Sequence, residues 1–183
     1  NIHQPGPGVG GHCLPIDPWF LGQGSNELDL ISTAREINDG MSQYIIEILN
    51  RELGSLENKK IAILGVAYKG NVGDTRKSPG LKLARELQAT TPPNSETVAA
   101  DGGAGVDIAL HDPHVEDQTL DLVDFESALS DADAVVITTD HDEFENLSPA
   151  AVIDSMQRSI VFDTKDILDA NKWKDTGATV HRI

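Results

Sequence analysis

The chain contains one cysteine, and it lies in a stretch rich in glycine and proline, GPGVGGHCLPIDPWF at residues 6–20. Glycines free such a loop for unusual dihedral angles, and its exposed N–H groups can hold an oxyanion or a phosphate. Asp17 and Pro18 are typical of the cap and first residue of a short helix. A helix N-terminus and a cationic neighbour such as His12 favour the nucleophilic thiolate. We therefore expect Cys13 to act as a nucleophile; burial as a small hydrophobe is the alternative.

A single cysteine excludes an internal disulfide and any cysteine-rich zinc site. The six histidines show no ligand spacing around it, so we expect no metal centre. The sequence has no signal-peptide pattern and no apolar run of about 18 residues, the length needed to cross a membrane. These features predict a soluble, cytoplasmic protein without a membrane partner.

The charge balance is strongly acidic, with 30 acidic and 14 basic residues and a formal net charge of −16. Such a surface repels nucleic acid and anionic lipid, because neither could gain energy from counterion release, so we expect neither as a partner. The acidic residues are spread along the whole chain. This spread favours a halophilic protein, whose self-repulsion is screened in molar salt, over an ordinary acidic one.

A long amphipathic helix is expected after residues 1–24, which carry loop signals throughout. Asn26 could cap this helix and Gly54 could end it. At 1.5 Å per residue it would be about 40 Å long, more than a small domain needs, so a domain linker or subunit interface is at least as plausible as a core helix. Its apolar residues recur at three- and four-residue steps: Leu28, Ile31, Ala34, Ile37, Met41, Tyr44, Ile45, Ile48 and Leu49.

Beyond this helix, apolar segments of strand length alternate with helical segments. We expect strands at 61–68, 106–113, 134–140, 159–164 and 178–183, and helices at 79–87, 126–132 and 148–157. Strands rich in Ile and Val that alternate with helices indicate a parallel sheet covered on both faces, which is a doubly wound α/β domain. Residues 89–105, rich in Pro, Gly, Ser and Thr, predict a mobile surface loop.

In doubly wound sheets, ligands bind beyond the carboxyl ends of the strands, where the strand order reverses. The loop after the first strand reads GVAYKGNVGDTRKSPG (65–80) and lacks both the G-x-G-x-x-G dinucleotide pattern and the Walker G-K-[ST] ending. Lys69 and Arg76 are candidates for binding phosphate near a helix start at Ser78. Surface cations on a sharp loop are the alternative. Asp112, after the second strand, is a candidate for a ribose hydroxyl.

Five stretches in this order, GPGVGGHCLPIDPWFL, AREINDGM, GVAYKGNVGDTRKSP, DADAVVITTDHDEF and VFDTKDILD, resemble the UDP-glucose/GDP-mannose 6-dehydrogenase family over essentially the whole chain. His12 and the isoleucine at Ile16, where UDP-glucose enzymes carry lysine, are more similar to UDP-N-acetylmannosamine (or UDP-N-acetylglucosamine) dehydrogenases. The resemblance implies two parts: residues 1–56, with the cysteine loop and a central dimerisation helix, and residues 57–183, a UDP-sugar-binding Rossmann-like domain.

The same resemblance implies an NAD-dependent oxidation of a UDP-sugar at C6 to the uronate, by two hydride transfers, for polysaccharide biosynthesis. It implies that Cys13 forms a thiohemiacetal and then a thioester, that Asp17 assists, and that Arg76 reaches NAD. Lys165 stands where the family usually has an arginine from the partner subunit, and lysine keeps the charge without the bidentate fork. The implied substrate-binding residues are Gln4, Pro5, Gly6, Pro7, Gly8, Val9, Gly10, Tyr68, Lys69 and Lys165.

The family also places a Rossmann domain with G-x-G-x-x-G before the cysteine loop. We therefore expect this chain to be the C-terminal part of a longer enzyme, a homodimer through the central helix, and inactive alone. Two other hypotheses remain at this level: a UDP-sugar-binding module without chemistry, and a free-standing cysteine hydrolase that uses a histidine brought to Cys13 by the fold.

Overall fold

The computed structural model describes residues 6–21, 28–90 and 105–183. The helices are α1 (Asp17–Leu21), α2 (Asp29–Leu53), α3 (Pro79–Ala89), α4 (Phe125–Leu129), α5 (Asp142–Glu145), α6 (Pro149–Ser155) and α7 (Ala170–Lys174). The strands are β1 (Lys60–Leu64), β2 (Asp107–His111), β3 (Ala134–Ile137), β4 (Ile160–Asp163) and β5 (Thr179–Arg182). None of the helices described is both long and apolar enough to cross a membrane.

The five strands form one parallel sheet in the order β2-β1-β3-β4-β5. Ile61 of β1 lies beside Ile108 on one side and Ala134 on the other. The chain thus moves outward from β1 to β2, then crosses back to β3, and the strand order reverses between β1 and β3. This confirms the predicted doubly wound α/β class and puts the ligand-binding edge at the carboxyl ends of β1 and β3.

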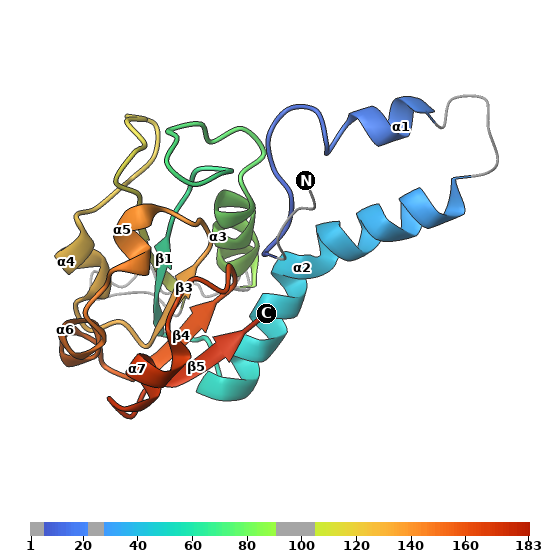
Figure 1. Ribbon diagram of the computed structural model, residues 1–183. Helices are drawn as coiled ribbons and strands as arrows, with labels where there is room; N and C mark the ends of the chain where they lie inside the picture. Colours follow the sequence, from blue (N-terminus) through green and yellow to red (C-terminus); the bar gives the residue numbers. More distant parts are fainter. Residues whose placement is uncertain (1–5, 22–27, 91–104) are drawn as a thin grey trace.

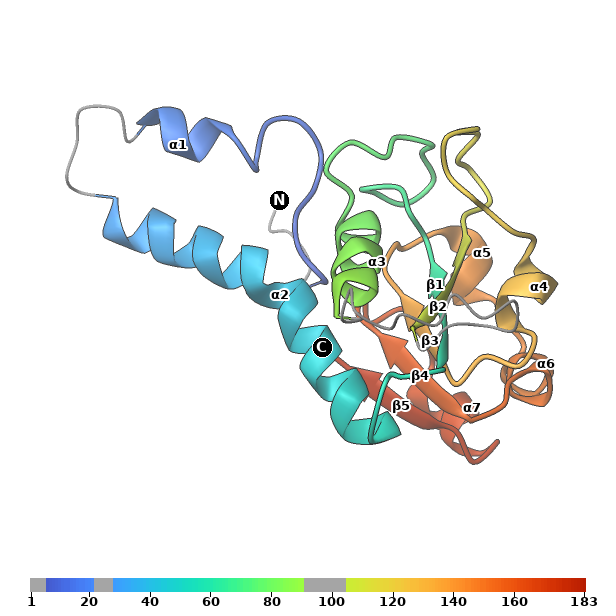
Figure 2. The same ribbon diagram turned by 180° about the vertical axis from the view of Figure 1, so that it is seen from behind.

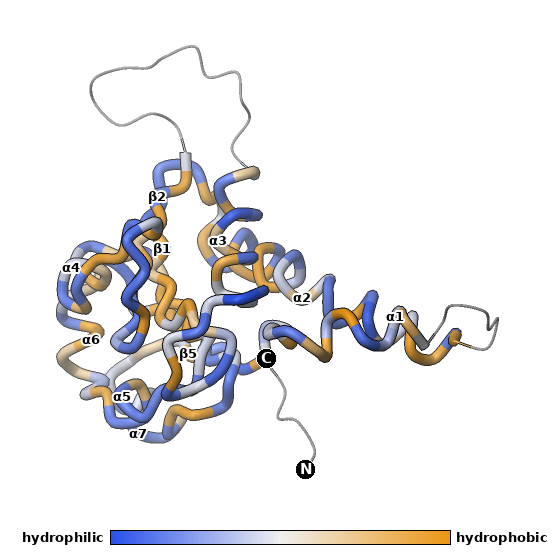
Figure 3. Tube along the Cα trace, turned by 90° about the horizontal axis from the view of Figure 1, so that it is seen from above, coloured by the Kyte–Doolittle hydropathy of each residue, from blue (hydrophilic) through white to orange (hydrophobic). Residues whose placement is uncertain are grey.

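Helices cover both faces of the sheet (Figures 1 and 2). One apolar cluster joins α2 and α3 to one face of the strands, and a second joins α4, α6 and α7 to the other. Apolar residues are concentrated along β1 and on the parts of α2 and α3 beside it (Figure 3). Burying a side chain such as Ile63, which is 0% exposed, contributes about 1.5–3 kcal/mol. The two clusters hold the sheet edge, and hence the loops beyond it, in place.

Helix α2 has 25 residues and serves two purposes along its length. Its C-terminal half packs into the core of its own chain through Ile45, Ile48 and Leu49. Its N-terminal half projects beyond the sheet, with α1 running alongside (Figure 1). The predicted stop at Gly54 is confirmed, since its N–H bonds to Asn50 O and its φ is 80°. The N-cap is Leu28, which has no side-chain capping bond; Asn26 lies outside the described residues.

All five strands end earlier than the sequence indicates, and two of them end three or four residues early. The strand expected at 61–68 stops at Leu64 because Gly65 has a φ of 98° and no room for a side chain against Thr139. The strand expected at 134–140 stops at Ile137. The last four residues of the first predicted strand (65–68) and the last three of the other (138–140) belong to loops instead, and their polar side chains lie at the sheet edge. Most of the predicted loop at 89–105 lies outside the described residues.

Candidate active site

Two loops meet where the strand order reverses: the Tyr68 loop (residues 65–78, after β1) and the β3 loop (residues 138–142). The hydroxyl of Thr139 donates to Ala67 O (2.8 Å), and Gly70 N–H donates to Asp140 Oδ1 (3.2 Å). Gly70 lies so close to the Asp140 carbonyl that no side chain would fit there. These contacts leave Lys69 exposed to solvent at the sheet edge, where the sequence predicts phosphate binding.

The cysteine loop (residues 6–16) packs directly on the Tyr68 loop. A Cβ on Gly10 would lie 2.8 Å from Tyr68 Cβ, and one on Gly11 would lie 3.0 Å from the Tyr68 ring. Gly11 has a φ of 85°, and its N–H donates to Arg76 O at 2.8 Å. These glycines therefore allow close approach, and the group that approaches them within the chain is the Tyr68 side chain; binding of an oxyanion or phosphate by this loop stays a prediction.

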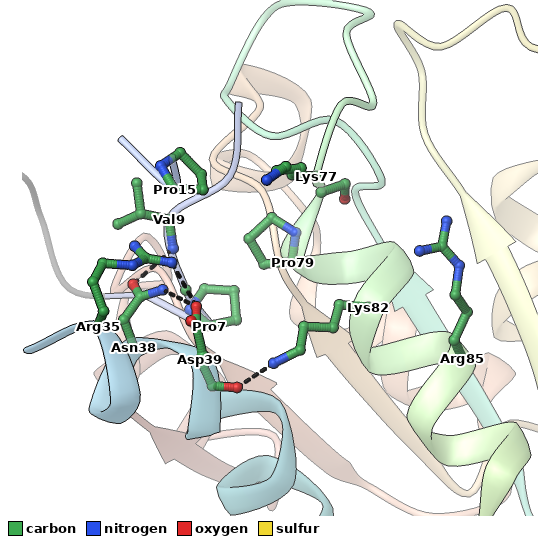
Figure 4. Close-up of a pocket in the computed structure, with 12 residues that line it drawn as sticks. Pro7, Val9, Pro15, Arg35, Asn38, Asp39, Lys77, Pro79, Lys82 and Arg85 are labelled. Atoms are coloured by element: carbon green, nitrogen blue, oxygen red, sulfur yellow. Dashed lines mark hydrogen bonds and ion pairs between the residues drawn. The ribbon is translucent and has the colours of Figure 1, made fainter. Parts of the chain in front are cut away.

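The other side of the cysteine loop is held by helices α2 and α3 around a pocket of about 280 Å³ (Figure 4). Val9 N–H donates to Asn38 Oδ1 at 2.9 Å. Arg35 pairs with Asp39 at 2.5 Å, and the Lys82 ammonium donates to the Asp39 carbonyl. The loop thus lies between α2 and the Tyr68 loop. Asp39 thus contacts Arg35 through its carboxylate and Lys82 through its backbone carbonyl, and the second of these contacts joins α2 to α3.

Cys13 is exposed, which excludes its burial as a small hydrophobe. Its Sγ lies 3.6 Å from His12 Nδ1, so the adjacent histidine does reach the thiol. The N–H groups of Ile16 and Asp17 both donate to Cys13 O, at 2.9 and 2.8 Å, and this turn leads into α1. Asp17 is exposed at the start of that helix. An accessible thiol with a base beside it is suited to nucleophilic attack on a carbonyl.

Lys165 follows β4 and reaches the cysteine loop of its own chain. Its Nζ would be 3.3 Å from a Cβ on Gly6 and lies 3.8 Å from Asp140 Oδ1. The structure places this ammonium beside the cysteine loop of the same chain, and the predicted contact with substrate across a subunit interface stays a prediction. Gln4 and Pro5, also predicted to touch substrate, lie outside the described residues.

Arg76 is held by an ion pair with Asp74. Its Nη2 lies 2.5 Å from Asp74 Oδ2, and its Nε bonds to both carboxylate oxygens at 3.0 and 2.9 Å. The side-chain hydrogen bond between them lowers the pKa of Asp74 to about 2 and raises the pKa of Arg76. The predicted contact of Arg76 with a cofactor stays a prediction, and it would require the guanidinium to leave or share this carboxylate.

Asp112 is not available to a ribose. Its carboxylate is buried and accepts N–H groups from Val66 (2.7 Å), Ala67 (2.9 Å) and His114 (2.9 Å), and it also bonds to His141 (3.0 Å). Burial raises its pKa, but the bonds from His141 and the backbone amides outweigh that effect and lower the pKa to about 2. Sequence reasoning placed Asp112 correctly at the sheet edge and assigned it the wrong contact.

Among the described residues, the side chains of His114, His141 and Glu143 come close enough together to hold a metal ion. Both ring nitrogens of His141 are already bonded, Nε2 to Asp112 and Nδ1 to the N–H of Asn71 (2.9 Å). His114 Nε2 bonds to Glu143 at 3.2 Å. The buried histidine therefore has no free ligand atom, and we assign no metal to this cluster.

The strand order β2-β1-β3-β4-β5, with the candidate residues at the reversal point, is that of a doubly wound domain whose ligands bind beyond the carboxyl ends of the strands. Residues 62–170 match the UDP binding domain of the UDP-glucose/GDP-mannose dehydrogenase family, and residues 1–40 match its central domain. The chain belongs to the UDP-glucose/GDP-mannose dehydrogenase family. The division at residue 56 stays a prediction, since the packing of α2 on the sheet joins the two parts.

The chain is 38% identical to a UDP-N-acetyl-D-mannosamine dehydrogenase of Methanococcus maripaludis over 98% of its length. It is 33% identical to an NDP-N-acetyl-D-galactosaminuronic acid dehydrogenase of Ralstonia nicotianae over 94% of its length. The solved UDP-D-ManNAc dehydrogenase of Pyrococcus horikoshii covers 100% of the chain at 31% identity and a TM-score of 0.80. The chain spans 38–40% of the length of these relatives.

Proposed function

We propose that this chain is the UDP-sugar-binding, C-terminal part of an NAD-dependent nucleotide-sugar 6-dehydrogenase. The observation that carries the proposal is the docking of the cysteine loop on the Tyr68 loop, with Gly10 and Gly11 against the Tyr68 ring. This contact brings an exposed thiol and the Lys69 ammonium to the same edge of the sheet. A diphosphate beside Lys69 would then leave its sugar within reach of the cysteine loop.

In this proposal Cys13 acts on the aldehyde that the first oxidation produces. The C6 alcohol loses a hydride and a proton, and the thiolate adds to the aldehyde carbon to give a thiohemiacetal. Loss of a second hydride and a proton gives a thioester, which water cleaves to the carboxylate and the free thiol. The N–H groups of the glycine-rich loop are suited to hold the oxyanion of these steps, and His12 is placed to take the thiol proton.

NAD would accept the two hydrides, and the described residues of this chain do not form a dinucleotide site. The loop after β1 has no G-x-G-x-x-G pattern, and its only proposed cofactor ligand, Arg76, is paired with Asp74. We therefore propose that the rest of the NAD site belongs to the part of the relatives that this chain does not span.

For the substrate we propose an N-acetylated UDP-sugar, with UDP-N-acetylmannosamine preferred. Relatives from Methanococcus maripaludis and Pyrococcus horikoshii carry that sugar in their names. Within the chain the supporting feature is Ile16, beside Cys13, where UDP-glucose enzymes carry lysine. A comparison of kcat/KM for UDP-glucose, UDP-N-acetylglucosamine and UDP-N-acetylmannosamine tests this choice, and a preference for UDP-glucose would contradict it.

We further propose that α2 pairs with its equal in a homodimer. Leu30, Ile37 and Tyr44 are 83%, 65% and 51% exposed, and they recur every seven residues along one side of the helix. Such a stripe of apolar residues on a projecting helix is typical of a subunit contact, and a two-fold axis would bury the same residues on both sides.

Replacing Cys13 tests the covalent step in a full-length dehydrogenase that carries this chain. We expect Cys13→Ser to lower uronate formation on the order of 10³-fold or more and to leave the dissociation constant of the UDP-sugar nearly unchanged. A serine ester hydrolyses slowly, and its alkoxide is hard to form near neutral pH.

The control is Ser32→Ala. Ser32 is a small polar residue on α2, outside the cysteine loop, and this variant should keep wild-type turnover. Uronate release by Cys13→Ser at the wild-type rate would contradict covalent catalysis. A non-catalytic binding module would show UDP-sugar binding with no turnover in the wild type, and a hydrolase would turn over ester substrates without NAD.

A further inference from the structure

Two fully buried polar side chains, Asp112 and His141, lie beneath the Tyr68 loop, each 0% exposed at its side chain. They come from different parts of the sheet edge, since Asp112 follows β2 and His141 follows β3. Asp112 Oδ2 accepts a hydrogen bond from the ring nitrogen Nε2 of His141 (3.0 Å). The pair therefore lies directly under the loop that carries the proposed substrate contacts Tyr68 and Lys69.

The contacts of His141 determine its tautomer. Asn71 N–H donates to His141 Nδ1 at 2.9 Å, so Nδ1 carries no proton and acts as an acceptor. The proton of the neutral ring is therefore on Nε2, which donates to the Asp112 carboxylate. The hydrogen bonds thus run in one direction: the amide of Asn71 donates to the imidazole, and the imidazole donates to the carboxylate.

These hydrogen bonds hold the backbone of the Tyr68 loop on both sides of Tyr68 and Lys69. Asp112 Oδ2 accepts the N–H groups of Val66 (2.7 Å) and Ala67 (2.9 Å), before Tyr68 and Lys69. His141 accepts the N–H of Asn71, after them. Tyr68 and Lys69 therefore lie between two fixed points set by one buried pair.

Burying a carboxylate costs desolvation free energy, and this cost indicates that Asp112 and His141 do more than fill space. An apolar pair of the same volume would avoid the desolvation of a buried carboxylate, but it would leave the amides of Val66, Ala67 and Asn71 without their acceptors. Asn71 also adopts a left-handed φ of 59°, which asparagine tolerates better than most residues, and its N–H is held by His141 in that conformation. The polar pair therefore supports one particular backbone path.

We propose that Asp112 and His141 are positioning residues that form a buried brace, which sets the Tyr68 loop for binding the UDP diphosphate. The effect extends to the thiol, because the Tyr68 ring lies against Gly11 of the cysteine loop. The proposal rests on the proposed function for its ligand, UDP, but the brace itself consists of contacts within this chain.

Two substitutions at His141 separate its two bonds in the 183-residue chain. His141→Asn keeps an acceptor where Nδ1 lies and loses the donor to Asp112; His141→Gln keeps a donor near Nε2 and loses the acceptor for Asn71. If the brace sets the loop, His141→Gln binds UDP about tenfold more weakly than the wild type in isothermal titration at high salt. His141→Asn should recover most of that loss. Val152→Ala, in the opposite apolar cluster, is the control for lost stability alone.

A purely structural role for His141 predicts a different outcome. All three variants would then melt at lower temperature and bind UDP with wild-type affinity at a temperature where each is folded, which would overturn the proposal. Amide hydrogen exchange in the wild type provides a test that needs no ligand and no variant. The amides of Val66, Ala67 and Asn71 should exchange as slowly as those of β1, and exchange of Asn71 orders of magnitude faster would also overturn it. Failure of the wild type to bind UDP, with these amides protected, would contradict the proposed function and leave the brace standing.

Discussion

Single residues at the sheet edge show which sequence signals are specific and which are not. The glycine-rich loop predicted that the main chain would bind an oxyanion or a phosphate; the structure shows the Tyr68 side chain against Gly10 and Gly11, and the ligand contact stays a prediction. Asp112 was predicted at the end of a strand and lies there, but its partners are amides 45 and 46 positions away in the sequence. His141, at the start of α5, gave no signal at all, since its contacts depend on how β2 and β3 are placed on either side of β1.

The ionisation of Asp112 predicts a specific dependence of stability on pH. Its pKa is 3.8 in the unfolded chain and about 2 in the folded one, so ionisation stabilises the fold above pH 4 by roughly 2 kcal/mol. That contribution is lost as the pH falls from about 4 to 2.

We therefore expect the difference in free energy of unfolding between the wild type and Asp112→Asn to be constant from pH 5 to 7 and to shrink by about 2 kcal/mol between pH 4 and 2. Denaturant titrations at fixed high salt measure this difference, and the variant cancels the titration of the other acidic residues. A difference that does not change with pH would show that Asp112 is not held as an ionised acceptor.

The helices show what hydrophobic periodicity can predict. The length of α2 and its end at Gly54 followed from its pattern, but the pattern could not tell which side packs on the same chain. Ile45 and Ile48, counted in one stripe with Ile37, are buried in the core of the chain, and Ile37 is exposed on the projecting half. The short helices α5 and α7, of four and five residues, are too brief to show a period, and tertiary contacts decide them.

This division of α2 determines which residues test the proposed homodimer. We expect Ile37→Asp with Tyr44→Asp to convert a dimer into a folded monomer, because paired carboxylates cannot be buried across a two-fold interface. Sedimentation velocity in high salt, over micromolar concentrations, measures the oligomeric state. Gln43→Asp, which adds charge at an exposed polar position of the same helix, should stay dimeric. A wild-type chain that is already monomeric throughout this range would contradict the contact.

On the scale of the whole chain, composition and strand alternation predicted the fold class, whereas the strand order came only from the structure. A net charge of −16 on 183 residues is the feature that acts over the entire surface. At low ionic strength these charges repel one another across distances of 10 Å and more, and molar salt reduces that range to about 3 Å. We therefore expect the fold to gain stability from added salt.

Thermal unfolding measured from about 0.1 M to 3 M KCl tests this property. We expect the melting temperature to rise steadily with salt, by more than about 10 °C over the range, because screening removes repulsion that is stronger in the compact state than in the unfolded chain. Circular dichroism at each salt concentration follows the transition. A melting temperature that is flat or falls with salt would contradict adaptation to molar salt.

UDP binding at the carboxyl ends of β1 and β3, where the strand order reverses, is the central property proposed for this chain. Isothermal titration of the 183-residue chain with UDP in molar KCl, for the wild type, Lys69→Ala and Lys172→Ala, measures it. Lys172, on α7, is 75% exposed at its side chain and serves as the matched loss of one surface charge. We expect wild type and Lys172→Ala to bind alike and Lys69→Ala to bind at least about tenfold more weakly, as for a lost charge-assisted bond to phosphate. Equal affinity in all three proteins, or no binding by the wild type, would contradict the assignment of this edge to the UDP-sugar.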